Sequence, residues 1–236
     1  MSIIVNPIQD IFVGFNSPNT TINLFNNFDD PFTTGKVANF NLVDNTIGNG
    51  EINIVLFDQA GQGAPITVEN FTNYANNGLY VNSIIHRSMP NFVIQGGGFT
   101  FNNLTVGNVP TFAPIVNEFS PNRSNVQGTI AMAKVGGNPD SATSQWFFNL
   151  GDNSANLDNQ NGGFTVFGQV LSSNDLDTIS AIASLPIRNG QAINPAFSDL
   201  PLNVDPNNIR IDQDDDLVRF ANISVNSVPE LNFTVV

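Results

Sequence analysis

The chain has 236 residues, of which 41% are hydrophobic and only 11% charged, and its formal net charge is −13. So acidic a chain repels a phosphate backbone, which excludes nucleic acid as a partner. The chain contains no cysteine, which excludes disulfides, thiolate nucleophiles and thiolate zinc sites, and no apolar run is long enough to insert into a membrane.

Residues 1–33 are predicted to form an irregular arm, rich in Asn, Pro and Phe, with one short strand over 11–15. The arm is apolar enough to pack on or near the rest of the chain, and residues 34–236 are predicted to form the main domain. The first residues lack the basic region and the long apolar core of a secretion signal. This favours a cytoplasmic location, with export, for example to a periplasm, as the alternative.

Apolar and polar residues alternate in two runs from Lys36 onward, which is typical of half-buried strands. The apolar members are Ala38, Phe40 and Leu42 in the first run and Ile52, Ile54 and Leu56 in the second. The Asn49-Gly50 pair between the two runs predicts a hairpin turn.

Two later segments carry apolar residues at helical spacing. The first follows Pro65 and ends at Gly78, and the second covers 174–185 with Pro186 just beyond it. Short apolar runs lie at 84–86, 92–95, 129–133, 146–150 and 165–171, and a last strand is expected at 217–225. Many short strands with two helices are typical of a mainly β protein, and we expect a closed antiparallel barrel capped by two α-helices. An extended loop over 186–216 precedes the last strand.

A lone arginine, Arg87, lies within the apolar segment IIHRSMPNFVIQGGGF, residues 84–99. A buried guanidinium without a partner is costly, and arginine does not neutralise itself. Either a carboxylate or carbonyl satisfies Arg87, or it lies in a half-buried groove and meets a ligand there. We favour the groove. Gln95 lies an even number of residues further on, so strand alternation can return it to the same face.

Other kinds of site are less well supported. His86 is the only histidine and points away from Arg87 along a strand, so we expect an interior histidine with its hydrogen bonds satisfied. No nucleophile motif is present, and no metal or cofactor is expected. The acidic segment 212–216 has ligands of the type that Ca²⁺ prefers, but it lacks the spacing of a calcium loop. A solvated acidic loop is the preferred interpretation.

Three segments together resemble the cyclophilins, the cyclosporin-binding peptidyl-prolyl cis–trans isomerases. They are IIHRSMPNFVIQGGGF, GTIAMAKVGGNPDSATSQWFFNL and LDNQNGGFTVFGQV, in the family's order and at its approximate spacing. The resemblance covers residues from about 36 to 225 and implies an eight-stranded antiparallel barrel capped by two helices.

Carried over residue by residue, the resemblance makes Arg87 the catalytic arginine and Gln95 the amide that orients it. In this resemblance Phe92 forms the floor of the proline pocket. The full set of substrate-binding positions that it implies is Phe92, Val93, Met132, Ala133, Lys134, Gln145, Phe147, Asn156, Leu157 and Phe164.

Four of these positions depart from the family's common pattern. Asn156 stands where a tryptophan is often the main contact to cyclosporin, so the resemblance implies weak cyclosporin binding. Val93, Lys134 and Phe164 replace a common Met, Asn and His, and Lys134 adds a cation at the groove rim.

The resemblance implies a bacterial enzyme that catalyses rotation about X–Pro bonds in peptides and unfolded proteins, acting as a monomer and without a cofactor. The alternative is a binding or chaperone module that holds proline-containing segments, with turnover incidental.

Overall fold

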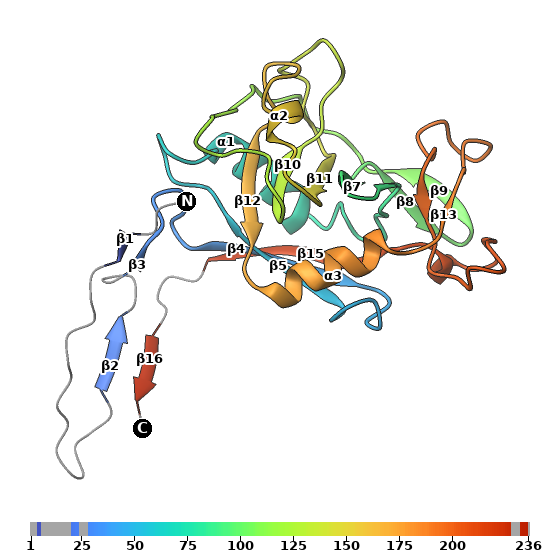
Figure 1. Ribbon diagram of the computed structural model, residues 1–236, viewed down its shortest axis with the longest axis horizontal. Coiled ribbons are helices and arrows are strands. Elements are labelled where there is room, and N and C mark those ends of the chain that lie inside the picture. Colours follow the sequence, from blue (N-terminus) through green and yellow to red (C-terminus); the bar gives the residue numbers. More distant parts are fainter. Residues whose placement is uncertain (1–3, 6–19, 24–27, 228–231, 236) are drawn as a thin grey trace.

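The computed structural model describes residues 4–5, 20–23, 28–227 and 232–235 (Figure 1). Eight strands form one antiparallel sheet in the order β15-β4-β5-β12-β10-β11-β7-β6. Their bounds are β4 Lys36–Leu42, β5 Glu51–Leu56, β6 Arg87–Met89, β7 Val93–Gly96, β10 Thr129–Met132, β11 Trp146–Asn149, β12 Val166–Val170 and β15 Phe220–Ser227. The mainly β architecture predicted from the sequence is therefore confirmed.

The β4–β5 hairpin follows the alternation of the sequence. Ala38, Phe40 and Leu42 point into the core from β4, while their polar neighbours remain partly exposed. The connection differs from the prediction. Asn49 and Gly50 do not form a two-residue turn; they are the last two residues of an eight-residue connection over 43–50. The Leu42 N–H donates to the Gly50 carbonyl across the base of this connection.

The sheet curls until its two ends approach each other. The segment before β6 exchanges backbone hydrogen bonds with the segment that enters β15: the Ile85 N–H donates to Val218 O, and the Phe220 N–H donates to Ser83 O. One isolated bridge, between Ile84 and Arg219, lies among these bonds. The ladder is not continuous between β15 and β6, so the structure shows a curled eight-stranded sheet and does not confirm the closed barrel that the sequence predicted.

Two longer helices pack against the sheet as the sequence predicted. Helix α1 (Pro65–Asn76) contacts β15 and β12, and helix α3 (Ser173–Ala183) contacts β5, β12 and β7 (Figure 1). The core between them is rich in aromatic rings. The Phe40 ring lies 5.1 Å from Trp146 and 5.5 Å from Phe148, both edge-on, an arrangement that adds to the stability gained from burial.

The stretch 186–216 is more ordered than a loop. It contains two short paired strands, β13 (Ile187–Arg188) and β14 (Leu200–Pro201), and its apolar side chains form a small second core. Members of this core are Ile84, Phe101, Phe197, Leu200, Leu202 and Leu217. Strand β14 lies against β6, where the Ser88 N–H donates to Asp199 O at 2.7 Å. The hairpin β8–β9 (Phe99–Asn102 and Thr105–Asn108) packs beside it.

Part of the N-terminal arm is described. Strand β1 (Ile4–Val5) pairs with β3 (Phe28–Asp29), and β2 (Thr20–Asn23) pairs with β16 (Asn232–Val235) apart from the main sheet (Figure 1). Phe32 is buried against Phe57, with ring centroids 5.4 Å apart. The strand predicted over 11–15 lies outside the described residues. No helix in the described ranges is long and apolar enough to cross a membrane.

Candidate active site

Arg87 and Gln95 lie opposite each other on the antiparallel strands β6 and β7. The strand alternation used to predict a shared face is therefore confirmed. Arg87 Nη1 donates to Gln95 Oε1 at 3.5 Å, and Gln95 Nε2 donates to Gln145 Oε1 at 2.9 Å. Arg87 is half-buried and forms no ion pair with any carboxylate of the described residues. Its second terminal nitrogen, Nη2, donates to Met89 Sδ at 2.6 Å. Two uncharged groups, the Gln95 amide and the Met89 sulfur, thus orient the guanidinium and leave its positive charge unneutralised.

The glycines at 96–98 let the backbone pass close to the Gln95 and Gln145 side chains. Gly97 has φ +77°, and a side chain there would meet Ser144 O at 2.6 Å. A Cβ at Gly98 would lie 2.6 Å from the amide carbon of Gln145. These glycines are needed for a left-handed backbone and for close packing.

A cavity of about 250 Å³ opens beside Arg87. Its lining residues are Arg87, Phe92, Val93, Gln95, Ala133, Lys134, Phe147, Leu157 and Phe164. The Phe147 and Phe164 rings meet edge-on with centroids 5.8 Å apart. The structure therefore brings together nine of the twelve residues that the sequence nominated, in a slot with apolar walls and one charged side.

Lys134 closes one rim of the cavity. Its Nζ donates to Asn161 O at 2.9 Å and to Gly163 O at 2.6 Å, and lies 4.9 Å from the centroid of the Phe164 ring. Burial lowers the pKa of Lys134, and the negative charge of Asp140 acts in the opposite direction. The cation therefore ties the end of β10 to the loop before β12.

The other three nominated residues lie elsewhere. Gln145 lines an adjoining cavity of about 130 Å³, together with Gln95 and Lys134. Asn156 is exposed on the short helix α2 (Ser154–Leu157) and does not line the cavity. Met132 belongs to the core inside the sheet, so the expectation that it lines the groove is wrong. Alternation along β10 turns its neighbours Ala131 and Ala133 to the groove side instead.

His86 is an interior residue, as predicted. It is 2% exposed and packs edge-on against Phe99, with ring centroids 5.0 Å apart, and near Phe197. Its Nδ1, however, has no hydrogen-bond partner among the described residues, so its hydrogen bonds are not all satisfied as expected. Desolvation, helped by the charge of Arg87, lowers the pKa of His86 to about 4. His86 is therefore a neutral packing residue at physiological pH.

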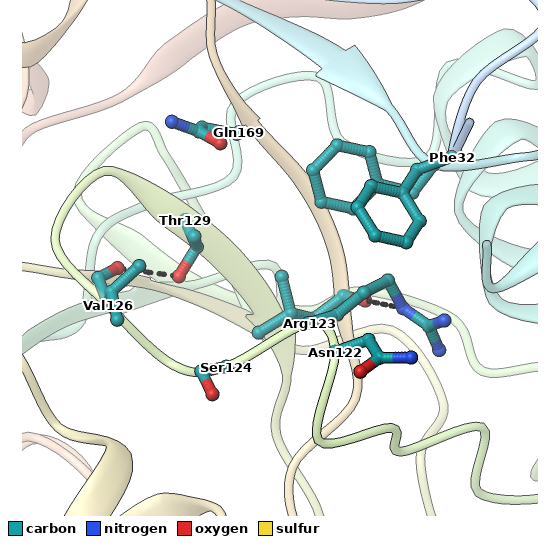
Figure 2. Close-up of a pocket in the computed structure, with 9 residues that line it drawn as sticks. Phe32, Asn122, Arg123, Ser124, Val126, Thr129 and Gln169 are labelled. Carbon is teal, nitrogen blue, oxygen red and sulfur yellow. Dashed lines mark hydrogen bonds between the residues drawn. The ribbon is translucent and has the colours of Figure 1, made fainter. Parts of the chain in front are cut away.

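No sequence pattern indicated Arg123, an arginine that is buried. It borders a cavity of about 330 Å³ between Phe32, Phe57 and the 122–126 segment (Figure 2). Its Nε donates to Val166 O at 3.1 Å, and its two terminal nitrogens donate to Gln62 O and Glu118 O. Backbone carbonyls satisfy this guanidinium, so Arg123 braces the loops beside the sheet.

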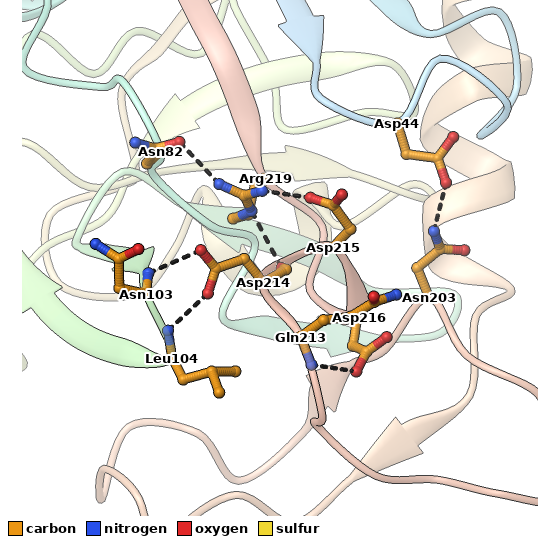
Figure 3. Close-up of polar contacts among 10 residues, drawn as sticks. All are labelled: Asp44, Asn82, Asn103, Leu104, Asn203, Gln213, Asp214, Asp215, Asp216 and Arg219. Atoms are coloured by element: carbon orange, nitrogen blue, oxygen red, sulfur yellow. Dashed lines mark hydrogen bonds and ion pairs between the residues drawn. The ribbon is translucent and has the colours of Figure 1, made fainter.

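The acidic segment 212–216 serves the fold. Asp214 accepts hydrogen bonds from the backbone N–H groups of Asn103 and Leu104, both at 2.7 Å, and Asp215 pairs with Arg219 (Figure 3). These bonds lower the pKa of Asp214. No group of three potential metal ligands occurs within the described ranges. The segment is therefore more than the solvated loop expected, because it fastens the β8–β9 hairpin to the start of β15.

Comparison with known proteins agrees with this geometry. The family model described as cyclophilin type peptidyl-prolyl cis-trans isomerase/CLD matches residues 42–198. The peptidyl-prolyl cis-trans isomerase of Acinetobacter baylyi is 44% identical over 138 residues, which cover 58% of this chain and 69% of the relative. Peptidyl-prolyl cis-trans isomerase B of Escherichia coli is 38% identical over 141 residues, covering 58% and 82%.

Solved structures give the same fold. A cyclophilin type peptidyl-prolyl cis-trans isomerase of Cryptosporidium parvum has a TM-score of 0.57 at 19% identity, covering 83% of this chain and 99% of that one. Its structure in the presence of the dipeptide Ala-Pro has a TM-score of 0.55. The chain belongs to the cyclophilin family and is a peptidyl-prolyl cis–trans isomerase.

Proposed function

We propose that Arg87 is the catalytic residue and that Gln95 holds it in position for the substrate. The observation that supports this is the placement of an arginine without a carboxylate partner, among the described residues, on the wall of a cavity lined mainly by apolar side chains. The remaining lining residues, chiefly Phe92, Phe147 and Leu157, grip the proline ring. Loss of isomerisation on replacing Arg87 in a folded chain tests the assignment.

The chemistry asks only for stabilisation of a twisted amide. An X–Pro bond resists rotation with a barrier of about 18–20 kcal/mol, because planarity gives resonance. In the twisted state the prolyl nitrogen becomes pyramidal and regains a lone pair, which Arg87 can meet with an N–H. The planar isomers have no such lone pair, so this hydrogen bond favours the transition state over both ground states. No proton leaves the substrate and no covalent bond breaks.

The substrate is an extended, proline-containing segment of a peptide or an unfolded protein. The six apolar lining residues, Phe92, Val93, Ala133, Phe147, Leu157 and Phe164, suit a neutral ring. The adjoining cavity at Gln145, which shares Gln95 and Lys134 with the first, suits a neighbouring residue of the same segment.

We expect weak cyclosporin binding, because Asn156 offers no aromatic surface at the rim. Asn156→Trp should raise cyclosporin affinity by up to about tenfold, since one well-placed aromatic contact contributes about 0.5–1.5 kcal/mol. The measurement is inhibition of isomerase activity by cyclosporin in the parent and the variant, with kcat/KM for the peptide as control. Equal inhibition constants would contradict this role for position 156.

Two structural expectations complete the proposal. The arm over 1–33 packs on the sheet through Phe32, and the sheet behaves as a closed barrel through the bonds between 83–85 and 218–220. If so, the Ile85 and Phe220 amides should exchange with deuterium as slowly as those of the central strands β5 and β12. Hydrogen exchange followed by NMR checks this, and fast exchange at these two amides would show an open edge.

A further inference from the structure

Three asparagine side chains lie directly behind the cavity that contains Phe92, Leu157 and Phe164. Asn149 and Asn125 are fully buried and Asn153 is 8% exposed. None of them lines the cavity, and none is among the site residues that the resemblance implied. Buried amides are costly unless all their polar atoms are paired, so their arrangement calls for an explanation.

The side chains form one continuous chain of hydrogen bonds from one wall of the cavity to the other. Asn153 Nδ2 donates to Phe92 O at 2.8 Å and to Asn149 Oδ1 at 2.8 Å. Asn149 Nδ2 donates to Asn125 Oδ1 at 3.2 Å and to Thr129 Oγ1 at 2.9 Å. Asn125 Nδ2 then donates to Phe164 O at 3.0 Å. Both N–H groups of each amide therefore find an acceptor.

Leu157, another residue that lines the cavity, is also connected to Asn153. The Leu157 N–H donates to Asn153 O at 2.8 Å, and the Phe164 N–H donates to Leu157 O at 3.0 Å. Asp158 reinforces the far end, because its Oδ1 accepts from Asn125 Nδ2 at 2.8 Å and from the Asn125 N–H at 3.0 Å. The asparagine amides thus bond to the backbone carbonyls of Phe92 and Phe164, and backbone bonds link Leu157 to Asn153 and to Phe164.

The acceptors at the two ends of this hydrogen-bond network fix which amide atoms donate and which accept. Both ends are carbonyl oxygens, so the terminal amides must present nitrogen to them, and Asn149 in the middle must accept from one neighbour and donate to the other. A buried network in which every amide N–H has an acceptor has one arrangement and rigidifies its surroundings. A change at Asn149 therefore disconnects Phe92 from Phe164 without touching either ring.

We propose that Asn125, Asn149 and Asn153 are positioning residues that set the distance between the Phe92 and Phe164 walls, and so fix the ring size that the cavity accepts. This inference rests on the assignment of that cavity as the proline site. A cavity with a fixed width binds the ring in the ground state and the transition state alike, so the network acts on KM and on ring selectivity. Arg87, in contrast, acts on kcat.

The test compares Asn149→Leu and Asn153→Ala with the parent on two peptides, one with proline and one with its six-membered homologue, pipecolic acid. Both variants should raise KM for the prolyl peptide by about three- to tenfold with kcat within about twofold. The ratio of kcat/KM for the pipecolyl peptide to that for the prolyl peptide should rise at least about threefold. Asn153→Ala removes only the two side-chain bonds at the Phe92 end of the network. This variant provides the test on its own if Asn149→Leu does not fold.

Two controls separate this inference from simpler explanations. Thr178→Ala removes a buried hydroxyl on α3, away from the cavity, which accepts from the Asn49 N–H; it should lower stability and leave KM and the ring ratio unchanged. Phe147→Ala alters the cavity itself and should raise KM. Folded asparagine variants with the parent's KM and ring ratio overturn the network proposal. An unchanged KM in Phe147→Ala overturns the proline-site assignment instead, and this inference with it.

Discussion

Arg87→Ala should lower kcat for a prolyl peptide by about 10- to 100-fold while the chain stays folded. A hydrogen bond from a charged donor contributes about 1.5–3 kcal/mol, and each factor of ten in rate corresponds to about 1.4 kcal/mol. Arg87 lies on the groove side of the edge strand β6 and makes no ion pair with described residues, so its removal leaves no buried countercharge. The measurement is kcat and KM by a protease-coupled assay, with thermal melting of both proteins.

Arg87→Lys is the matched control for charge. Lysine keeps the positive charge but loses the planar fork that Gln95 orients, so it should recover little of the lost rate. Full recovery by lysine would show that charge alone is sufficient. A folded Arg87→Ala enzyme with a kcat close to that of the parent would contradict the catalytic assignment.

The second large effect concerns stability at acid pH. His86 has a pKa of about 4 in the folded chain, below its ordinary value of 6.5, because it is desolvated and lies next to Arg87. Between pH 6.5 and pH 4 the unfolded chain binds a proton at His86 that the folded chain does not bind. The free energy of unfolding therefore falls as the pH falls through this window. The loss is about 2 kcal/mol between pH 7.5 and pH 5, and reaches about 3 kcal/mol once the pH is below 4.

Urea unfolding followed by the fluorescence of Trp146, the single tryptophan and a fully buried one, measures this loss. His86→Phe keeps an aromatic ring against Phe99 and Phe197 but has no titrating group, so its stability should change much less between the two pH values. The neighbours in ring contact with His86 are uncharged, which leaves Arg87 as the nearby charge involved. Parallel losses in parent and variant would assign the effect to other groups.

The alternation of side chains along a strand was sufficient to predict which residues on the strands face the site. A period of two places Arg87 and Gln95 on one face, and the structure pairs them directly. The same rule, applied to the second segment, would have excluded Met132, because Ala133 lines the cavity and its sequence neighbour must point inward. That error came from carrying over a residue without checking its face.

Contacts between distant segments could not be predicted in this way. Asn125, Asn149 and Asn153 gave no signal in a chain rich in asparagine, and Asp214 looked like part of a solvated run until its bonds to Asn103 and Leu104 were seen. The order within 186–216 likewise depends on packing against β6 and the β8–β9 hairpin, which no local pattern encodes. Composition indicates polarity, but only the tertiary fold decides which polar groups meet.

The way in which β14 covers β6 limits how a client chain can approach. An unprotected border of a sheet invites other extended chains to add as a further strand. Here the Ser88 amide is already bonded to Asp199, and Pro90 has no N–H to offer. We therefore expect that a client chain does not add to the sheet as a further strand at this border.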